Sequence, residues 1–304
     1  MHYIRNFKLQ IKINFDNLDK LKNQTLLKLK PEKILMCKPE YFDVNYTGNE
    51  FMKDNIGKTD KLKASEQWEA LKKVYEELGF QIVLIEPCKD LVDMVFTANQ
   101  SLPFINKSGK KSVILSKMKN DQRKEEVKYF KDFYLENGYE IIELPNEIRY
   151  FESMGDCVID YQRNILFGGY GFRTEERTYD IIAKYTNFKI VKLKLINPVL
   201  YHLDTCLSVL NSETAVIQDS AFDEEGMNEL RGHFSNLLYT DGKENLEYFV
   251  CNCHCPDGKN VIVQKGSVKF KEDIKKTGLN LIEVETGEFM RSGGSVFCMK
   301  LMIY

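Results

Sequence analysis

The stretch "VYEELGFQIVLIEP" at residues 74–87 joins a charged, helix-like segment to a β-rich run through one glycine. Glycine just after a helix is a common stop signal, and a run of Val, Ile and Leu before proline is typical of a strand. The same order recurs at 133–145 and 185–198, with weaker copies at 230–240 and 274–286. Five copies, spaced roughly 45 to 60 residues apart, predict an α/β protein built from a repeated helix–strand unit, as in propellers or solenoids.

Further β-rich runs lie between these copies, so each unit is predicted to hold two or three strands and one helix. They are "KSVILS" (111–116), "NILFGGYGF" (164–172), "TAVIQDS" (214–220) and "KNVIVQK" (259–265). The chain contains no low-complexity linker, which favours a single domain over residues 1–304. Residues 1–30 fall outside the repeat and are predicted to be an extra N-terminal segment, either a leading strand or an appendage.

The composition excludes several classes of function. A formal net charge of −2 gives no basic field for nucleic acid, and no apolar run approaches the roughly 20 residues of a membrane span. The N-terminus lacks the apolar centre of a secretory signal, so we expect a cytoplasmic protein. Eight cysteines in 304 residues are expected to be free thiols rather than a disulfide framework. The sequence leaves the oligomeric state open, and a homo-oligomer is one alternative.

The segment "DLVDMVFTANQSL" (90–102) carries polar residues at both ends of a β-rich run. If a strand covers residues 93–99, Asp93 and Asn99 point to the same face, because side chains alternate with a period of two. Asp and Asn are also common turn residues that cap a strand end. The pattern alone therefore leaves a binding role and a capping role open.

Two carboxylates flank a glycine in "RYFESMGDCVID" (149–160). Glu152 and Asp156 on such a turn suit a cation or a guanidinium, but they also suit a solvated turn. The glycine-rich run "FGGYGFRTEERT" (167–178) matches neither the dinucleotide fingerprint nor a phosphate-binding loop. Its Arg173 has the planar fork that binds a carboxylate through two hydrogen bonds.

Histidine is the usual general acid and base near neutral pH, and the best placed of the four histidines is His202. If "NPVLYHLDTCLSVL" (197–210) is a strand, Asp204 shares its face and can orient the imidazole. A histidine satisfied within the core is the alternative. Metal binding is less favoured: in "VCNCHCPDG" (250–258) the cysteines alternate along an expected strand, which is not the paired spacing of structural zinc sites.

The chain ends with "RSGGSVFCMKLMIY" (291–304), in which two glycines precede Cys298. Glycine allows a turn or a close approach of the backbone to a neighbour. One interpretation is a last strand that enters the core with Cys298 as a small apolar residue. The other is a turn that presents Cys298 to a pocket as a nucleophile.

These motifs in order resemble the guanidino-group modifying superfamily, or penteins, which includes arginine deiminases, dimethylargininases, arginine dihydrolases and amidinotransferases. The resemblance runs from Leu35 to Ile303 and is carried by "LMCKPEYFDVNYTGNEFM", "DMVFTAN", "FESMGD", "GYGFRT", "YHLDTC" and "GGSVFC". It is greatest for the dimethylargininase-like and arginine dihydrolase-like branch. The resemblance implies a five-bladed, pseudo-symmetric α/β propeller, the pentein fold, with the active site in its central channel.

By the same resemblance, Cys298 is the nucleophile, His202 the general acid and base, and Glu152 the carboxylate that pairs with the guanidinium or the histidine. The remaining residues implied to bind substrate are those of the guanidinium pocket and of the α-carboxylate, with further polar neighbours: Asp93, Asn99, Asn49, Arg123, Arg173, Asp156, Asp204 and Asn252. A planar guanidinium is well matched by carboxylate and amide oxygens, and thiolate attack on its carbon gives a covalent thiouronium intermediate. No metal or organic cofactor is required.

Two departures from the family pattern bear on the substrate. Many deiminases carry an acid where this chain has Asn99, whereas dihydrolase-like members have asparagine there and at the position of Asn49. This favours an arginine dihydrolase that gives ornithine and ammonia, although dimethylargininase-like members share the asparagine. Dimethylargininase, deiminase, amidinotransferase and an inactive arginine-binding homologue are the alternatives. The second departure is Ser153, where the branch usually has glycine.

Overall fold

The computed structural model describes residues 30–304, so the predicted N-terminal segment, residues 1–30, lies almost entirely outside the described residues. The chain divides into the units Met1–Pro31 and Glu32–Tyr304, and all described helices and strands belong to the second. Within residues 30–304, none of the helices has the length and apolar character needed to cross a membrane. These residues form a mixed α/β fold of small sheets.

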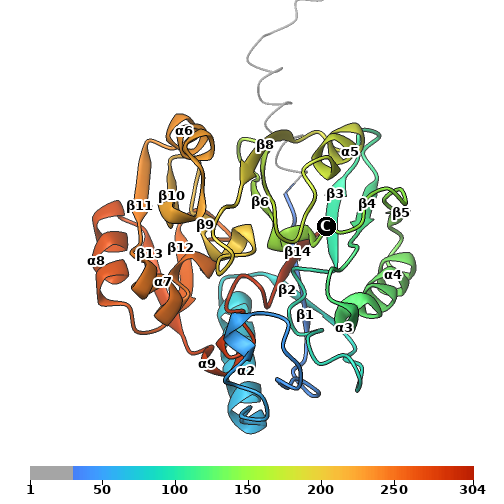
Figure 1. The fold of residues 1–304 in the computed structure, drawn as a ribbon, viewed down its shortest axis with the longest axis horizontal. Coiled ribbons are helices and arrows are strands. Elements are labelled where there is room, and N and C mark those ends of the chain that lie inside the picture. Colours follow the sequence, from blue (N-terminus) through green and yellow to red (C-terminus); the bar gives the residue numbers. More distant parts are fainter. Residues whose placement is uncertain (1–29) are drawn as a thin grey trace, which may run out of the picture. The chain divides into compact units, whose positions relative to one another are not determined.

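The first helix–strand copy, which contains residues 74–87, shows how the sequence builds the repeat. Strand β1 (Lys33–Cys37) leads through α2 (Lys61–Glu77) to β2 (Gln81–Ile85), which pairs with β1 in parallel. The Asp60 side chain caps α2 by accepting a hydrogen bond from a backbone N–H of the first turn. Gly79, with φ of 87°, then turns the chain into β2. Strand β14 (Leu301–Ile303) completes this sheet and runs antiparallel to β1. The first and last described strands therefore lie side by side (Figure 1).

The other four predicted helix–strand copies are confirmed. In each copy, a helical segment connects two strands that pair in parallel. In three of them an additional strand precedes the pair and lies antiparallel to it. These three units are β3 (Ser101–Ile105), β4 (Lys111–Leu115), α3 (Asp121–Lys124), α4 (Glu126–Glu136) and β5 (Glu140–Ile142); β6 (Cys157–Asp160), β7 (Ile165–Tyr170), α5 (Thr178–Tyr185) and β8 (Lys189–Lys194); β9 (Leu207–Val209), β10 (Thr214–Ile217), α6 (Glu224–His233) and β11 (Asn236–Tyr239). The last is β12 (Asn260–Gln264), α8 (Val268–Thr277) and β13 (Asn280–Val284), with α7 (Gly242–Tyr248) before it and α9 (Gly287–Met290) after it.

Each long helix buries one face against its sheet. In α2 the buried apolar residues are Ala64, Trp68, Leu71 and Tyr75, whose spacing of three and four places them on one stripe. Trp68 is 1% exposed, and it packs with the strands of the first sheet in one of several apolar clusters. Burying aromatic side chains of this size contributes a few kcal/mol each, on the order of 1.5–3 kcal/mol.

Three strands expected from the sequence are replaced by short turns. Residues 92–98 form turns instead of a strand over 93–99, and Leu203–Thr205 form one turn of 3-10 helix (η3) instead of a strand through His202. Val250–Asn252 form another such turn (η5), so the cysteines of 250–258 do not alternate along a strand. In each case a polar side chain is held by a neighbouring segment, which overrides the local β-pattern. On or directly beside these turns lie five of the eleven candidate site residues: Asp93, Asn99, His202, Asp204 and Asn252.

Candidate active site

One narrow cavity is lined by residues from segments that lie far apart in the sequence, between Tyr46 and Cys298. Its lining includes Cys298, His202 and Arg173, together with polar residues from the turns of 92–99 and the loop before α2. Of the residues implied by the family resemblance, the cavity is also lined by Asn49, Asp93, Asn99 and Arg123. The two alternatives for the C-terminal segment are therefore both partly correct: Cys298 packs in the core, and it also faces a pocket.

The Cys298 thiol is held between two polar side chains. Its Sγ donates a hydrogen bond to Oδ2 of Asp204 over 3.0 Å and accepts one from Nδ2 of Asn252 over 3.3 Å. Burial raises the pKa of the thiol well above its usual value, and the neighbouring Asp204 carboxylate raises it further. Cys298 is therefore a neutral thiol at neutral pH.

Asn252 shapes the turn that carries Cys298. Its Oδ1 accepts the backbone N–H groups of Ser295, at 3.1 Å, and of Cys298, at 3.3 Å. Its Nδ2 also donates to the backbone oxygen of Asp204 over 2.9 Å. Asn252 lies outside the cavity lining and beside Cys298.

The two glycines before Cys298 allow close packing of the chain. Gly293 has φ of 84°, a left-handed conformation that side chains other than glycine rarely adopt. A Cβ atom on Gly294 would lie 2.4 Å from the ring of Phe96, which is shorter than any tolerated contact. The backbone oxygen of Cys298 then accepts the N–H of Ala98 over 3.2 Å. The glycines therefore bring Cys298 against the turn that carries Asp93 and Asn99.

Glu152 and His202 form a buried pair. Oε2 of Glu152 lies 2.7 Å from Nε2 of His202 and accepts from Nη1 of Arg173 over 2.9 Å, while Oε1 accepts the N–H of Lys119 over 2.9 Å. Burial works to raise the pKa of Glu152, but the Arg173 charge and the His202 bond outweigh it and lower that pKa to about 2. Glu152 is therefore ionised at neutral pH and fixes the orientation of the imidazole.

Asp93 and Asn99 lie on one side of the cavity, although they do not share a strand. The Asp93 carboxylate accepts hydrogen bonds from the hydroxyls of Tyr46 and Ser292. Oδ1 of Asn99 accepts from Arg123 over 2.9 Å, and its Nδ2 is buried with no partner among residues 30–304. An unpartnered buried amide is costly, so this Nδ2 is a candidate donor to a ligand.

Arg123 is engaged inside the protein. Its guanidinium is paired with Glu126 at 2.9 Å and also donates to Asn99 and to the backbone oxygen of Asp93 at 3.1 Å. Burial raises the pKa of Glu126 to about 7 despite the attraction of the arginine. Arg123 thus holds the Asp93–Asn99 turn from behind. By contrast, the Arg173 guanidinium lies 4.4 Å from the ring centre of Tyr201, at the cavity.

The remaining expected residues take different positions. Asn49 lines the cavity and donates to the Tyr201 hydroxyl over 3.1 Å. Asp204 faces Cys298 rather than His202, and burial raises its pKa to about 7. Asp156 lies outside the cavity lining, because its oxygens accept from Leu203 N–H, at 3.1 Å, and from the Thr174 hydroxyl, at 2.7 Å. The structure therefore places Asp156 as a brace between the turns that carry Glu152 and His202.

The sequence interpretation missed four polar residues of the cavity. Tyr46, Asn120, Tyr201 and Ser292 all line it. The hydroxyls of Tyr46 and Ser292 donate to Asp93. Tyr201 directly precedes His202 and Ser292 directly precedes the glycine pair, but neighbouring position alone does not indicate a role. Among residues 30–304 no group of three or more His, Cys, Asp or Glu side chains is arranged to hold a metal ion.

A mixed α/β fold with a buried thiol, a histidine–carboxylate pair and further carboxylate and amide groups around one cavity defines the guanidine-modifying class. The chain belongs to the family described as N,N dimethylarginine dimethylhydrolase, eukaryotic, whose model matches residues 38–304. This confirms the resemblance seen in the sequence motifs.

The chain is similar to several curated proteins of this class. It is 32% identical over 266 residues to AgrE of Nostoc sp. and 33% identical over 267 residues to ArgZ of Synechocystis sp., both bifunctional arginine dihydrolase/ornithine cyclodeaminases. Each match covers 87% of this chain but only 37% and 36% of the relative, so the chain spans little more than a third of their length. It is also 31% identical to the dimethylarginine dimethylaminohydrolase of Mycobacterium tuberculosis, over 87% of this chain and 83% of that protein.

Solved structures support the same grouping. The N-terminal domain of ArgZ, an arginine dihydrolase crystallised as a cysteine-to-serine variant with substrate, has a TM-score of 0.82 and 32% identity; the match covers 89% of this chain and 97% of that domain. A dimethylarginine dimethylaminohydrolase from Pseudomonas aeruginosa has a TM-score of 0.71 at 20% identity, covering 90% and 99%. The second likeness shows the shared fold.

Proposed function

We propose that this protein hydrolyses the guanidinium group of arginine as an arginine dihydrolase, giving ornithine, carbon dioxide and two molecules of ammonia. The observation that carries the proposal is the meeting of Cys298, His202 and Asp93 in one cavity. The 32–33% identity to relatives named as arginine dihydrolases supports it. Cys298, His202 and Glu152 are the proposed catalytic residues.

The proposed reaction begins with a bound guanidinium cation. Asp93 accepts its N–H groups. The free Nδ2 of Asn99 is a donor and a guanidinium has no acceptor, so this amide would instead donate to the carbonyl oxygen of citrulline in the second round. The cavity measures about 30 Å³, which is smaller than arginine, so the substrate has to displace side chains. The bonds from Tyr46 and Ser292 to Asp93 are the ones that the guanidinium would replace.

Cys298 then attacks the guanidinium carbon after losing its proton, which Asp204 is placed to accept at 3.0 Å. The tetrahedral adduct collapses when His202, oriented by Glu152, donates a proton to the departing ammonia. A covalent thiouronium remains on Sγ. Water activated by the same imidazole attacks its carbon and releases citrulline with the thiol. A second round on citrulline releases ammonia and carbamate, which breaks down to carbon dioxide and leaves ornithine.

We assign the substrate α-carboxylate to Arg173 in preference to Arg123. Arg123 already donates hydrogen bonds to Glu126, Asn99 and backbone oxygens. Arg173 lies at the cavity and bonds only Glu152 and the Gly48 backbone oxygen among residues 30–304. A planar guanidinium has five N–H donors, so donors remain for a carboxylate.

The second candidate function is that of a dimethylargininase, which gives citrulline and an amine from N-methylated arginine. The 31% identity to the mycobacterial relative favours it, and Asn99 is compatible with both. A deiminase, an amidinotransferase or an inactive arginine binder are further alternatives. For the dihydrolase, Asn99→Asp is expected to weaken the second hydrolysis, so that citrulline accumulates. Unchanged ornithine output from that variant would remove the asparagine argument.

We also propose that the five helix–strand units form a five-bladed propeller within a single catalytic domain, with the cavity at its centre. Support comes from the five small sheets among residues 30–304. Each contains a parallel pair of strands that a helical segment connects along the chain. A cytoplasmic setting is proposed as well, because free cysteines such as Cys298 persist in reducing compartments.

The test is mass spectrometry of the products after the pure protein is incubated with arginine and, separately, with asymmetric dimethylarginine. Ornithine from arginine is expected, whereas citrulline formed only from the methylated substrate would replace the proposal by the second candidate. Cys298→Ser should abolish turnover and leave the circular dichroism spectrum unchanged. Turnover by that variant, or silence from both substrates, would contradict the proposed function.

A further inference from the structure

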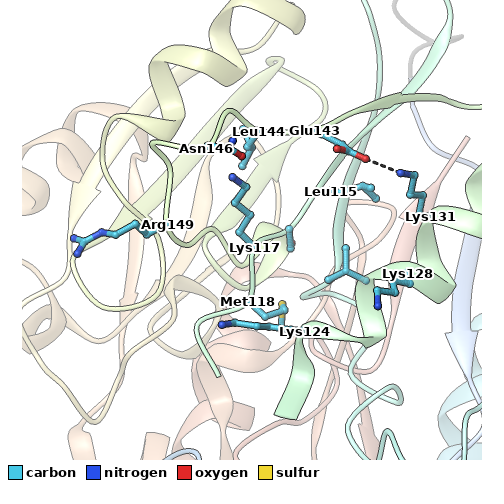
Figure 2. A pocket seen from close by; sticks show the side chains of 12 residues that line it. Leu115, Lys117, Met118, Lys124, Lys128, Lys131, Glu143, Leu144, Asn146 and Arg149 are labelled. Carbon is cyan, nitrogen blue, oxygen red and sulfur yellow. Dashed lines mark hydrogen bonds and ion pairs between the residues drawn. The ribbon is translucent and has the colours of Figure 1, made fainter. Parts of the chain in front are cut away.

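A second cavity, of about 460 Å³, lies between α4, the segment after β4 and the loop after β5 (Figure 2). It shares no lining residue with the cavity around Cys298. Its floor is apolar and is formed by Leu115, Met118, Val127 and Leu144. A volume of this size is within the range of small-molecule sites.

The rim of this cavity is strongly basic. Five cations line it against a single acid: Lys117, Lys124, Lys128, Lys131 and Arg149, with Glu143. Three of the lysines lie on α3 and α4, whereas Lys117 and Arg149 come from two other segments (Figure 2). Lys131 pairs with Glu143 over 2.6 Å, while Lys124 and Lys128 pair with exposed acids on their own helical turns. Exposed pairs of this kind contribute little to stability, so a bound anion can take these cations over.

Lys117 is the fixed cation of the group. Its Nζ donates to the backbone oxygens of Pro145 and Ile148 over 2.8 and 3.1 Å. Among residues 30–304 it forms no ion pair with an acid. Backbone carbonyls orient the ammonium but do not neutralise it, so its charge remains available to a ligand in the cavity.

An apolar floor with several cations at the mouth suits a ligand with an apolar body and a multiply charged anionic group. A phosphate monoester carries nearly two negative charges and several acceptor oxygens, which match cations that come from different segments. We propose that this cavity binds a small organic phosphate, and that a bound ligand alters the guanidine site.

The second part of this inference rests on the proposed function and on the segment that separates the two cavities. Ser116 lines the basic cavity, and its hydroxyl donates to the backbone oxygen of Asn99 over 2.6 Å. Lys117 exchanges two backbone hydrogen bonds of 2.9 Å with Phe151, and Lys119 N–H holds Glu152. A ligand that moves residues 115–119 therefore moves the supports of Asn99 and Glu152.

The binding test is isothermal titration calorimetry of the full chain with three probes: adenosine monophosphate, ribose 5-phosphate and inorganic phosphate. Adenosine monophosphate should bind best, because its base can cover the apolar floor. Lys128→Glu should weaken that binding about tenfold or more, since an attraction becomes a repulsion. Lys276→Glu is the matched control, because Lys276 is 73% exposed and pairs with an acid three residues away, as Lys128 does at 70%.

No measurable binding of any probe, or equal binding by Lys128→Glu and the control, would overturn the site. Equal affinity for inorganic phosphate and adenosine monophosphate would overturn the apolar part of the assignment. The coupling is tested by the KM and kcat for arginine with and without adenosine monophosphate. A change in either that Lys128→Glu removes is expected, and unchanged kinetics at saturating probe would overturn the coupling. Because calorimetry needs no turnover, failure of the proposed function and failure of the site are distinguished.

Discussion

Replacing Glu152 by glutamine tests how much of the site depends on one buried charge. The wild-type carboxylate accepts from His202, Arg173 and Lys119 N–H, and its pKa is lowered from 4.5 to about 2. A shift of that size corresponds to about 3 kcal/mol of stability at neutral pH. Glutamine keeps one acceptor oxygen but turns an N–H group toward a donor. We expect Glu152→Gln to lower the free energy of unfolding by about 3 kcal/mol.

The pH dependence follows from the lowered pKa. A carboxylate that is more acidic in the folded state stabilises the protein above its unfolded pKa, near 4.3, and loses this effect as pH falls toward 2. The difference between wild type and Glu152→Gln should therefore be constant from about pH 6 to 8 and shrink below about pH 4.5. Urea unfolding followed by circular dichroism measures both.

The control is Glu176→Gln, which removes an exposed partner of Lys192 and should change stability by less than about 0.5 kcal/mol. A Glu152→Gln variant as stable as wild type at pH 7 would refute the reasoning, as would a difference that grows at low pH. Loss of turnover with unchanged stability would show that Glu152 acts on the reaction alone.

Two further substitutions separate local strain and electrostatics. Ser153 has φ of 41°, and its hydroxyl lies 2.6 Å from that of Ser116; both Ser153→Gly and Ser153→Ala lose this bond, so the glycine variant should be more stable by about 1 kcal/mol in urea unfolding because it alone relieves the left-handed strain. Equal stability would show that the strain is absent. Asp204→Asn removes the carboxylate that raises the Cys298 pKa, so iodoacetamide should alkylate the thiol faster near pH 8, and an unchanged rate would contradict that electrostatic role.

The repeated architecture could be predicted because its signals are local. Each helix is followed by a turn and a β-rich run, as in 74–87, and these features depend on neighbours within a few residues. The parallel pairing of each copy then follows from the helix that joins its two strands. The prediction of a strand over 93–99 was wrong, because the conformation there depends on distant contacts. Asp93 is held by Ser292, and Asn99 is held by Arg123.

Most candidate residues could be named from the sequence because a family motif carried them, as for Cys298, His202 and Glu152. Tyr46 also stands in a quoted motif, but its role shows only in its hydrogen bond to the distant Asp93. The pairing of Asp204 with the thiol, rather than with His202, was also hidden, because it depends on the 3-10 turn at 203–205 and on the placement of Asn252. Contacts between segments nearly 100 residues apart leave no periodic pattern in either segment.

The charges around Cys298 support the proposal of a cationic substrate. At rest Cys298 is a neutral thiol, because burial and Asp204 both disfavour the thiolate. Lys300 directly precedes β14 and is only 1% exposed. Burial lowers its pKa to about 7. It therefore compensates Asp204 only partly. A guanidinium bound at Asp93 adds a full positive charge beside the thiol and so favours its ionisation. In the proposed reaction the substrate itself activates the nucleophile, and the same thiol reacts slowly with neutral molecules that lack this charge.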